Sequence, residues 1–261
     1  MIYGSPDAPP VTLIHGLGSS FRTWDRGVPL IESAARIYAV ELDASRSIEG
    51  DADAVSALIE TPTMLVGHSR GGLVATAIAE RHPGLVRRLI LICPSWSVAS
   101  RTGADRPIER ALAIPVIGEV LWTLASESRQ RSAVQSAFAP GTTVPYQFIA
   151  DVRARGRRAY TDSSRAIDDY LRTAPLAERL KNIPMPTELV FGEHDARVSA
   201  PRNEFSTLRN THLTELPGIG HSPPWEAPHK IAELITTSVA NWPRARTAAG
   251  TVAAAQQRKK L

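Results

Sequence analysis

One serine stands in a segment whose residue types can support nucleophilic chemistry. Residues 63–72 read ThrMetLeuValGlyHisSerArgGlyGly, in which a strand-like run leads directly to Ser69 and a helical pattern follows. A serine on so sharp a strand-to-helix turn has an exposed hydroxyl, and the strand and helix pass so closely that small residues are needed two positions before and after it. Gly67 and Gly71 occupy those positions, so the pattern predicts an exposed, nucleophilic serine.

The part of the chain after Ser69 contains two residues of the types that such a serine needs as partners. A serine hydroxyl becomes a good nucleophile only when a base takes its proton and an acid orients that base. Asp195 lies in the turn GlyGluHisAsp after the strand-like run 187–191, and His221 lies in a glycine-rich loop after the run 212–216. The order serine, acid, histidine is the one in which this type of serine turn is followed by its partners.

Glu193 is an alternative acid in the same turn. It lies two residues before Asp195, so its longer side chain starts from a different point on the turn. Another strand-like run ends at Cys93, but the segment ProSerTrpSer (94–97) that follows it contains no acid. We therefore expect Asp195 to be the acid that orients His221.

Four motifs together resemble the α/β-hydrolase fold family, in its cap-bearing, serine esterase-like form. They are HisGlyLeuGly, GlyHisSerArgGly, PheGlyGluHisAsp and GlyHisSerProPro, and the likeness spans about residues 9–242. The resemblance implies that Ser69 is the nucleophile, His221 the general base and Asp195 its orienting acid.

The resemblance also implies a backbone site for the charge that develops on a carbonyl oxygen under attack. The N–H of Arg70, next to Ser69, and the N–H of Leu17, in the HisGlyLeu turn after the first strand, are expected to form this oxyanion hole. Such donors act on charge that appears only in the tetrahedral intermediate, and loss of one costs about 10²–10³ in rate. His15 is expected to support the turn that carries Leu17.

These candidate residues need a scaffold that brings several strand ends together. Strand-like runs alternate with helical patterns, which is typical of βαβ units and a parallel sheet covered on both faces. The expected strands are 11–14, 36–42, 63–66, 85–93, 187–191 and 212–216, and the expected helices are 51–60, 71–82 and 226–240. The fold class is therefore α/β, and the resemblance implies an α/β-hydrolase with a mostly parallel, twisted sheet flanked by helices.

Residues 96–180 interrupt this alternation and are mostly helical in pattern. We expect them to form a cap over the carboxyl ends of the strands, with residues 1–95 and 181–243 forming the core. The ArgAlaArgGlyArgArg run (153–158) is expected on a solvated helix face. Only about nine residues precede the first strand, too few at about 3.3 Å per residue for the two antiparallel strands that usually begin this family, so a shortened N-terminal sheet edge is expected.

Charge and cysteine content argue against other classes of protein. The 261-residue chain has a formal net charge of +4, but five basic residues follow Glu233, the last acid, and the rest of the chain has 25 basic and 26 acidic residues. Residues 244–261 are therefore expected to be a basic, disordered tail, and no nucleic-acid partner is expected. Cys93 is the only cysteine, which excludes a disulfide scaffold and a cysteine-rich metal site.

The chain shows no targeting or membrane-spanning pattern. Its first residues lack the basic segment and apolar core of a signal peptide, and no apolar stretch approaches the roughly 18–20 residues that span a bilayer. A cytoplasmic protein is expected, as a monomer or homodimer, with no membrane partner, no cofactor and no metal. An exposed sheet edge can recruit a second copy, which keeps the homodimer open.

Other histidines and tryptophans have simpler interpretations. The histidines expected at turns or on the surface are His68, His82, His194, His212 and His229. The tryptophans expected as candidate substrate contacts are Trp96, Trp122 and Trp225. Trp96 is the best placed of these, because it follows a strand-like run directly.

The residues and the resemblance together predict a serine hydrolase that acts on a small-molecule acyl substrate. The expected reaction is cleavage of a carboxylic ester, thioester or related acyl compound through an acyl-enzyme on Ser69. Two alternatives stay open, since fold does not determine function. The same site can serve acyl transfer, carbon–carbon cleavage, lyase or cyclase chemistry, or the chain can be a catalytically idle ligand-binding member of the family.

Overall fold

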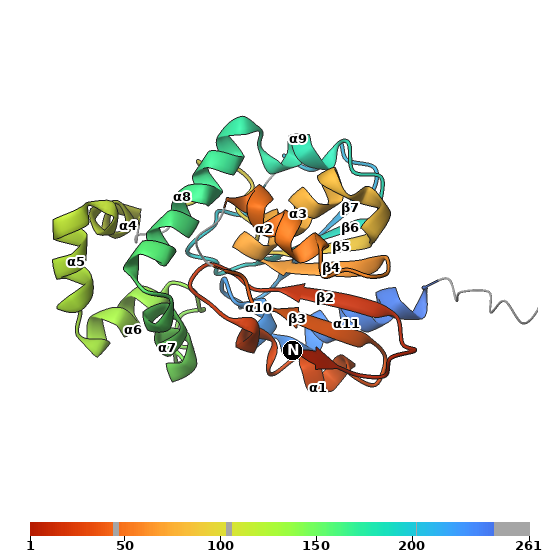
Figure 1. Ribbon diagram of the computed structural model, residues 1–261, viewed down its shortest axis with the longest axis horizontal. Coiled ribbons are helices and arrows are strands. Elements are labelled where there is room, and N and C mark those ends of the chain that lie inside the picture. Colours follow the sequence, from red (N-terminus) through yellow and green to blue (C-terminus); the bar gives the residue numbers. More distant parts are fainter. Residues whose placement is uncertain (44–46, 103–105, 202, 243–261) are drawn as a thin grey trace, which may run out of the picture.

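The computed structural model describes residues 1–43, 47–102, 106–201 and 203–242 (Figure 1). The basic tail expected at residues 244–261 lies outside these residues. Within them, the strands form one sheet in the order β1-β3-β2-β4-β5-β6-β7. The strands are β1 (Ile2–Tyr3), β2 (Pro10–Ile14), β3 (Arg36–Val40), β4 (Thr63–His68), β5 (Val86–Ile92), β6 (Thr187–Gly192) and β7 (Thr211–Leu216).

The sheet is parallel except at one edge. Among the strands of the described residues, β1 alone is antiparallel, and it pairs with β3 over two residues, Ile2 opposite Tyr38 and Tyr3 opposite Ile37. The remaining neighbours pair in parallel. This confirms the predicted α/β-hydrolase architecture and its shortened N-terminal edge. Because the strands run the same way, their carboxyl ends meet at one side of the sheet, which is where ligands bind in such folds.

Helices cover both faces of the sheet (Figure 1). The helices are α1 (Val28–Ile31), α2 (Ile48–Ser56), α3 (Arg70–Arg81), α4 (Arg106–Ala113), α5 (Pro115–Thr123), α6 (Glu127–Gln135), α7 (Tyr146–Arg155), α8 (Arg157–Thr173), α9 (Leu176–Leu180), α10 (Pro223–Glu226) and α11 (Pro228–Ala240), with 3₁₀ turns η1 (Phe21–Trp24) and η2 (Pro83–Leu85). One buried apolar cluster joins α2, α3, α9 and the end of α8 to the sheet. A second joins α1 and α11 to the opposite face.

Helix α2 starts earlier than the sequence predicts, at Ile48 rather than at residue 51. The hydroxyl of Ser47 accepts the N–H of Gly50 (3.0 Å) and caps the helix there. Asp51, which resembles a helix cap in the sequence, is instead buried inside the first turn and forms an ion pair with the buried Arg70. This ion pair attaches α2 to the first residue of α3.

A helical insertion lies between β5 and β6, as predicted. Helices α4 to α8 extend beyond the sheet, and α5 lies at the edge of the molecule farthest from it (Figure 1). A small separate cluster of buried side chains on α6, α7 and the segment between them, which includes Phe138 and Phe148, packs this region internally. None of the helices in the described part of the chain is long and apolar enough to cross a membrane.

The expectation of a solvated arginine run at residues 153–158 is wrong in part. The run is broken at Gly156, whose φ of +76° ends α7 and precedes α8. The Arg157 side chain is buried, where it donates from Nε to Glu119 (2.8 Å) and from Nη1 to the Leu112 carbonyl (2.7 Å). Arg155 also contacts protein, through an ion pair with Glu41, whereas Arg153 is exposed.

Candidate active site

Ser69 stands on a strained turn at the carboxyl end of the central strand β4. Its backbone has φ +52° and ψ −117°, a conformation that a residue with a Cβ rarely adopts. The glycines around it are required by close approach of the chain: a Cβ at Gly67 would lie 2.3 Å from the carbonyl oxygen of Gly71, and a Cβ at Gly71 would lie 2.3 Å from that of Ile14. The sharp turn therefore directs the serine hydroxyl away from the sheet.

The structure brings the predicted partners of Ser69 to this turn. Nε2 of His221 lies 2.9 Å from Oγ of Ser69, and Nδ1 of His221 lies 2.7 Å from Oδ2 of Asp195. The side chains of His221 and Asp195 are buried. These residues come from three separate loops, after β4, β6 and β7, and form one continuous chain of hydrogen bonds.

The environment of Asp195 favours its ionised form. Its second oxygen accepts the backbone N–H groups of Arg197 (2.8 Å) and Val198 (2.9 Å). Burial by itself would raise the pKa of this carboxyl, but the adjacent charge of His221 and these hydrogen bonds hold it below its ordinary value. The alternative acid, Glu193, turns elsewhere and accepts the N–H of Gly218 (2.8 Å).

The HisGlyLeu turn packs directly against the serine. A Cβ at Gly16 would lie 3.1 Å from the Cβ of Ser69, so the two turns are in contact. Nδ1 of His15 donates to the Gly16 carbonyl (2.9 Å), and its Nε2 accepts the N–H of Leu42 (3.1 Å). Burial lowers the pKa of His15 to about 3, which keeps the ring neutral in this arrangement. The ring braces the turn, as expected from the sequence.

The two residues expected to supply oxyanion donors lie beside Ser69. Leu17 lines the cavity above the serine, and Arg70 follows the serine as the first residue of α3. The guanidinium of Arg70 is buried in an ion pair with Asp51, and Arg70 is not among the residues that line the cavity. Their role as charge-stabilising donors stays a prediction.

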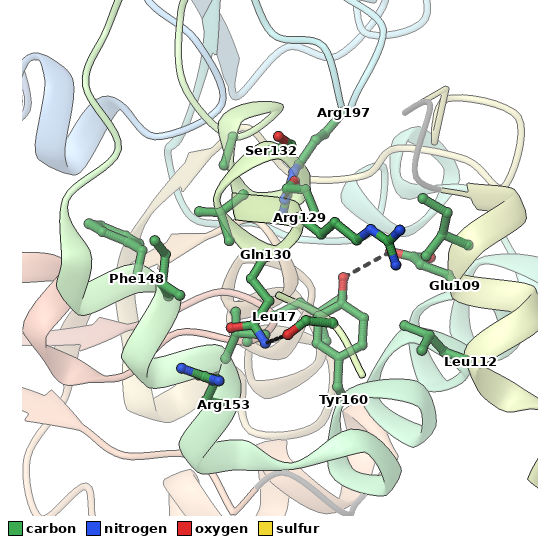
Figure 2. A pocket seen from close by; sticks show the side chains of 18 of the residues that line it. Leu17, Glu109, Leu112, Arg129, Gln130, Ser132, Phe148, Arg153, Tyr160 and Arg197 are labelled. Carbon is green, nitrogen blue, oxygen red and sulfur yellow. Dashed lines mark hydrogen bonds between the residues drawn. The ribbon is translucent and has the colours of Figure 1, made fainter. Parts of the chain in front are cut away.

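A cavity of about 690 Å³ has Ser69 among its lining residues. Ser69, His68 and His221 form its floor at the sheet, and side chains of α4 to α8 form its walls and roof. The walls are mostly apolar and include Leu112 and Phe148. Polar groups also enter it: the Tyr160 hydroxyl donates to Glu109 (3.3 Å), and Arg129 and Arg153 reach the cavity from α6 and α7 (Figure 2).

Of the three tryptophans expected to contact substrate, the structure brings one to the cavity. Trp122 lines it, next to the ring of Tyr160. Trp96 is not among the lining residues, because its ring packs on the core and its Nε1 donates to the carbonyl of Ser199 (2.7 Å). Trp225 also lies outside the lining, where it packs edge-on against Phe148.

His68 is a site residue that the sequence interpretation missed. The sequence predicts a turn or surface residue at this position, but His68 is buried, lines the cavity and donates from Nε2 to the backbone carbonyl of His221 (2.7 Å). Burial lowers its pKa to about 3. Its position directly before Ser69, at the end of a buried strand, was the one available signal. The sequence gives no signal that its partner would be the loop of His221.

One group of side chains in the described residues has the spacing of a metal site. The ligand atoms of Cys93, Asp195 and His221 lie within 4.8 Å of one another. Asp195 and His221 are already hydrogen-bonded to each other. Burial raises the pKa of the Cys93 thiol well above its ordinary value, which disfavours the thiolate that a metal would require. The arrangement fits a hydrogen-bonded acid–base pair better than a metal centre.

Comparison with known proteins agrees with this geometry. The profile of the Alpha/beta hydrolase family matches residues 13–234. A pimeloyl-[acyl-carrier protein] methyl ester esterase of Neisseria meningitidis serogroup A is 32% identical over 266 residues, covering 94% of this chain and 82% of that protein. A monoacylglycerol lipase of Xenopus laevis is 25% identical over 269 residues, covering 89% of this chain and 76% of that protein.

Solved structures share the fold at lower identity. A thermophilic esterase from Thermogutta terrifontis superposes with a TM-score of 0.74 at 17% identity, over 92% of this chain and 91% of that one. A hydrolase from Oleispira antarctica superposes with a TM-score of 0.72 at 16% identity, over 93% of this chain and 94% of that one. From its profile match, its relatives and its fold, the chain belongs to the alpha/beta hydrolase family.

Proposed function

We propose that this protein is an esterase that cleaves carboxylic esters through an acyl-enzyme on Ser69. The observation that carries the proposal is the chain of hydrogen bonds from Ser69 through His221 to Asp195 at the floor of a largely apolar cavity. The relatives described above support the reaction class, because they are named as an ester-cleaving enzyme and a lipase. An acyl ester is accordingly the substrate.

The first half of the reaction transfers the acyl group to the serine. Oγ of Ser69 attacks the ester carbonyl while Nε2 of His221 takes its proton, and the ionised Asp195 stabilises the imidazolium that forms. The negative charge on the former carbonyl oxygen is held by the N–H groups of Leu17 and Arg70. The tetrahedral intermediate then collapses, the ester C–O bond breaks, and the alcohol leaves with the proton from His221.

Water completes the cycle by the same route. It attacks the acyl carbonyl as His221 takes one of its protons, and a second tetrahedral intermediate forms. Collapse breaks the bond to Oγ, returns the proton to Ser69 and releases the carboxylic acid. Because Asp195 holds Nδ1 of the imidazole, Nε2 is the atom that faces the serine throughout.

The cavity defines the size of the substrate that we propose. A volume of about 690 Å³ is within the range of small-molecule sites, and its apolar walls suit an acyl chain of short to medium length. We assign these walls to the proposed cap, residues 96–180, which supplies most of the apolar side chains. Thioesters and related acyl compounds fit the same chemistry.

The test is hydrolysis of p-nitrophenyl acetate, butyrate and octanoate by the wild type, Ser69→Ala and Ser132→Ala. Ser132 lines the same cavity, so it is a matched control for removal of a serine hydroxyl. We expect turnover by the wild type and Ser132→Ala and its loss in Ser69→Ala, with a serine-reactive phosphonate adding mass at Ser69. Turnover that survives in Ser69→Ala would refute the assignment of the nucleophile.

Other results of the same experiment separate the alternatives. A phosphonate adduct at Ser69 without ester turnover would favour acyl transfer, carbon–carbon cleavage, lyase or cyclase chemistry at a competent site. Absence of both turnover and adduct would favour a ligand-binding protein.

A further inference from the structure

Helix α5 exposes a continuous apolar face. Val116 is 76% exposed, Leu121 is 43% exposed, and Leu124, the C-cap residue directly after the helix, is 70% exposed. The apolar side chains on this face are Val116, Ile117, Val120, Leu121 and Leu124. The last four follow Val116 by one, four, five and eight positions, a spacing that places all five on one side of a helix. An apolar helix face of this kind in contact with water marks an interaction surface.

The packing of α5 fixes which side faces outward. Gly118 is buried against the end of α4, where a Cβ would lie 2.1 Å from the carbonyl oxygen of Leu112. Glu119, the only acid on α5, pairs with the buried Arg157 of α8. These contacts hold the other side of the helix to the protein and leave the apolar face outward, at the edge of the molecule farthest from the sheet (Figure 1).

The apolar face continues into the cavity above Ser69. Ile108 on α4 and Leu121 on α5 are both exposed to solvent, and both also line the cavity. Trp122, the next residue along α5, lines the cavity as well. An amphiphile that rests against the exposed face therefore has an apolar route to the serine.

Acidic and basic side chains both occur on the helices around this face, but they do not balance. The acids of α4, α5 and α6 are each engaged in an ion pair: Glu109 with Arg101, Glu119 with Arg157, and Glu127 with Arg131. Arg110 on α4 and Arg129 on α6 are exposed, and neither has an ion-pair partner within the described ranges. Helices α4 and α6 therefore each carry one exposed cationic side chain that no described acid neutralises, and that of Arg129 also lines the cavity.

We propose that α4 and α5 dock on an anionic lipid surface, with the α5 face buried among the acyl chains and Arg110 and Arg129 at the headgroups. A helix with one apolar side and nearby basic residues lies in the plane of such a surface. A second copy of this chain fits less well, since two basic rims would face each other. The docking is interfacial, and it departs from the sequence-based expectation that the protein has no membrane partner.

The test measures co-sedimentation with vesicles of phosphatidylcholine, with and without phosphatidylglycerol. The variant is Val116→Asp/Val120→Asp, because these two residues belong to the exposed face and not to the cavity lining. The matched control is Leu58→Asp, which changes an equally exposed apolar residue outside the insertion. Hydrolysis of the water-soluble p-nitrophenyl butyrate checks that each protein is folded.

We expect the wild type and Leu58→Asp to bind vesicles that contain phosphatidylglycerol, and the double variant to bind at least about tenfold more weakly with unchanged butyrate hydrolysis. Equal binding to neutral vesicles would overturn the role of the arginines. Failure of the wild type to bind, or a dimer that the double variant dissociates, would overturn the proposal. Ser69→Ala is expected to bind vesicles like the wild type, because Ser69 does not belong to the exposed face. Vesicle binding therefore tests the docking proposal, and ester hydrolysis tests the esterase proposal separately.

Discussion

Nε2 of His68 donates a hydrogen bond of 2.7 Å to the backbone carbonyl of His221. The residue that precedes the proposed nucleophile therefore holds the main chain of the proposed base, although 153 positions separate the two in sequence. Their rings lie 5.3 Å apart. This hydrogen bond connects the loop after β7 to the end of β4. It therefore helps to fix the position of the His221 imidazole relative to Ser69.

Replacement of His68 by Phe removes this donor and leaves a buried carbonyl without its partner. The cost of such an unsatisfied group is about 1–3 kcal/mol, and we expect the free energy of unfolding to fall by about that amount. We also expect kcat to fall with little change in KM, because His221 loses its position rather than the substrate its contacts. His68→Gln keeps a side-chain N–H and is expected to recover part of kcat. Equal effects of both variants on kcat would contradict this positioning role.

Asp195→Asn tests which acid orients His221. The amide keeps the size of the carboxyl but presents the wrong hydrogen-bonding groups to Nδ1, and we expect kcat to fall by about 10³–10⁴. Glu193→Gln is the matched control, since this residue accepts the N–H of Gly218 and does not contact His221. Steady-state hydrolysis of p-nitrophenyl butyrate measures both. A larger loss of kcat in Glu193→Gln than in Asp195→Asn would show that Glu193, and not Asp195, orients His221.

Stability is expected to decrease as the pH falls below 6.5. The pKa values of His15 and His68 are lowered from 6.5 to about 3, mainly by burial, so between these values the unfolded chain binds protons that the folded protein excludes. The stabilisation is complete above pH 6.5 and is lost as the pH approaches 3. Each histidine contributes about 1.4 kcal/mol per pH unit to this slope.

Urea unfolding as a function of pH measures that slope. The slope of the unfolding free energy against pH reports how many more protons the unfolded chain binds than the folded protein. In His15→Gln we expect this difference below pH 6.5 to fall by about one proton, which lowers the slope by roughly 1.4 kcal/mol per pH unit. His229→Gln, which removes an exposed imidazole, serves as the control variant. An unchanged slope in His15→Gln would show that His15 is not the source of the acid sensitivity.

The glycines of the serine turn are expected to tolerate no side chain. In Gly71→Ala the new Cβ would lie 2.3 Å from the carbonyl oxygen of Ile14, which forces β2 and α3 apart. We expect the free energy of unfolding to fall by about 1–3 kcal/mol or more, together with loss of activity. In Gly84→Ala nothing lies within 4 Å of the new Cβ, and a change of no more than about 0.5 kcal/mol is expected. Thermal unfolding of both variants distinguishes them.

Two tryptophan variants separate substrate contact from core packing. Trp122→Ala removes a ring from the cavity, and we expect KM for p-nitrophenyl octanoate to rise about tenfold or more, since apolar contacts in a pocket are worth about 1–3 kcal/mol. Trp96→Phe keeps an aromatic ring but loses the hydrogen bond to Ser199, so stability should fall by about 1 kcal/mol with KM unchanged. The reverse pattern would place Trp96, not Trp122, against the substrate.

Much of the fold was predictable because its signals are local. A buried strand shows as a short apolar run, and Gly67 and Gly71 are adjacent in sequence to the turn that requires them. The order of Ser69, Asp195 and His221 along the chain also follows from where the strands end. Helix α2 is a local exception, because Asp51 serves an ion pair with Arg70 rather than a cap, and the sequence around it does not reveal its partner.

The sequence by itself determined the alternation of strands and helices, the serine turn and the residue types that accompany it. Only the tertiary structure decided that His68 supports His221, that Arg157 is buried beneath α5, and that Trp122 rather than Trp96 reaches the cavity. The reason is physical. Periodicity and turn chemistry act between near neighbours in the chain, whereas the outward direction of α5 and the cavity beneath the insertion depend on how helices pack across long separations.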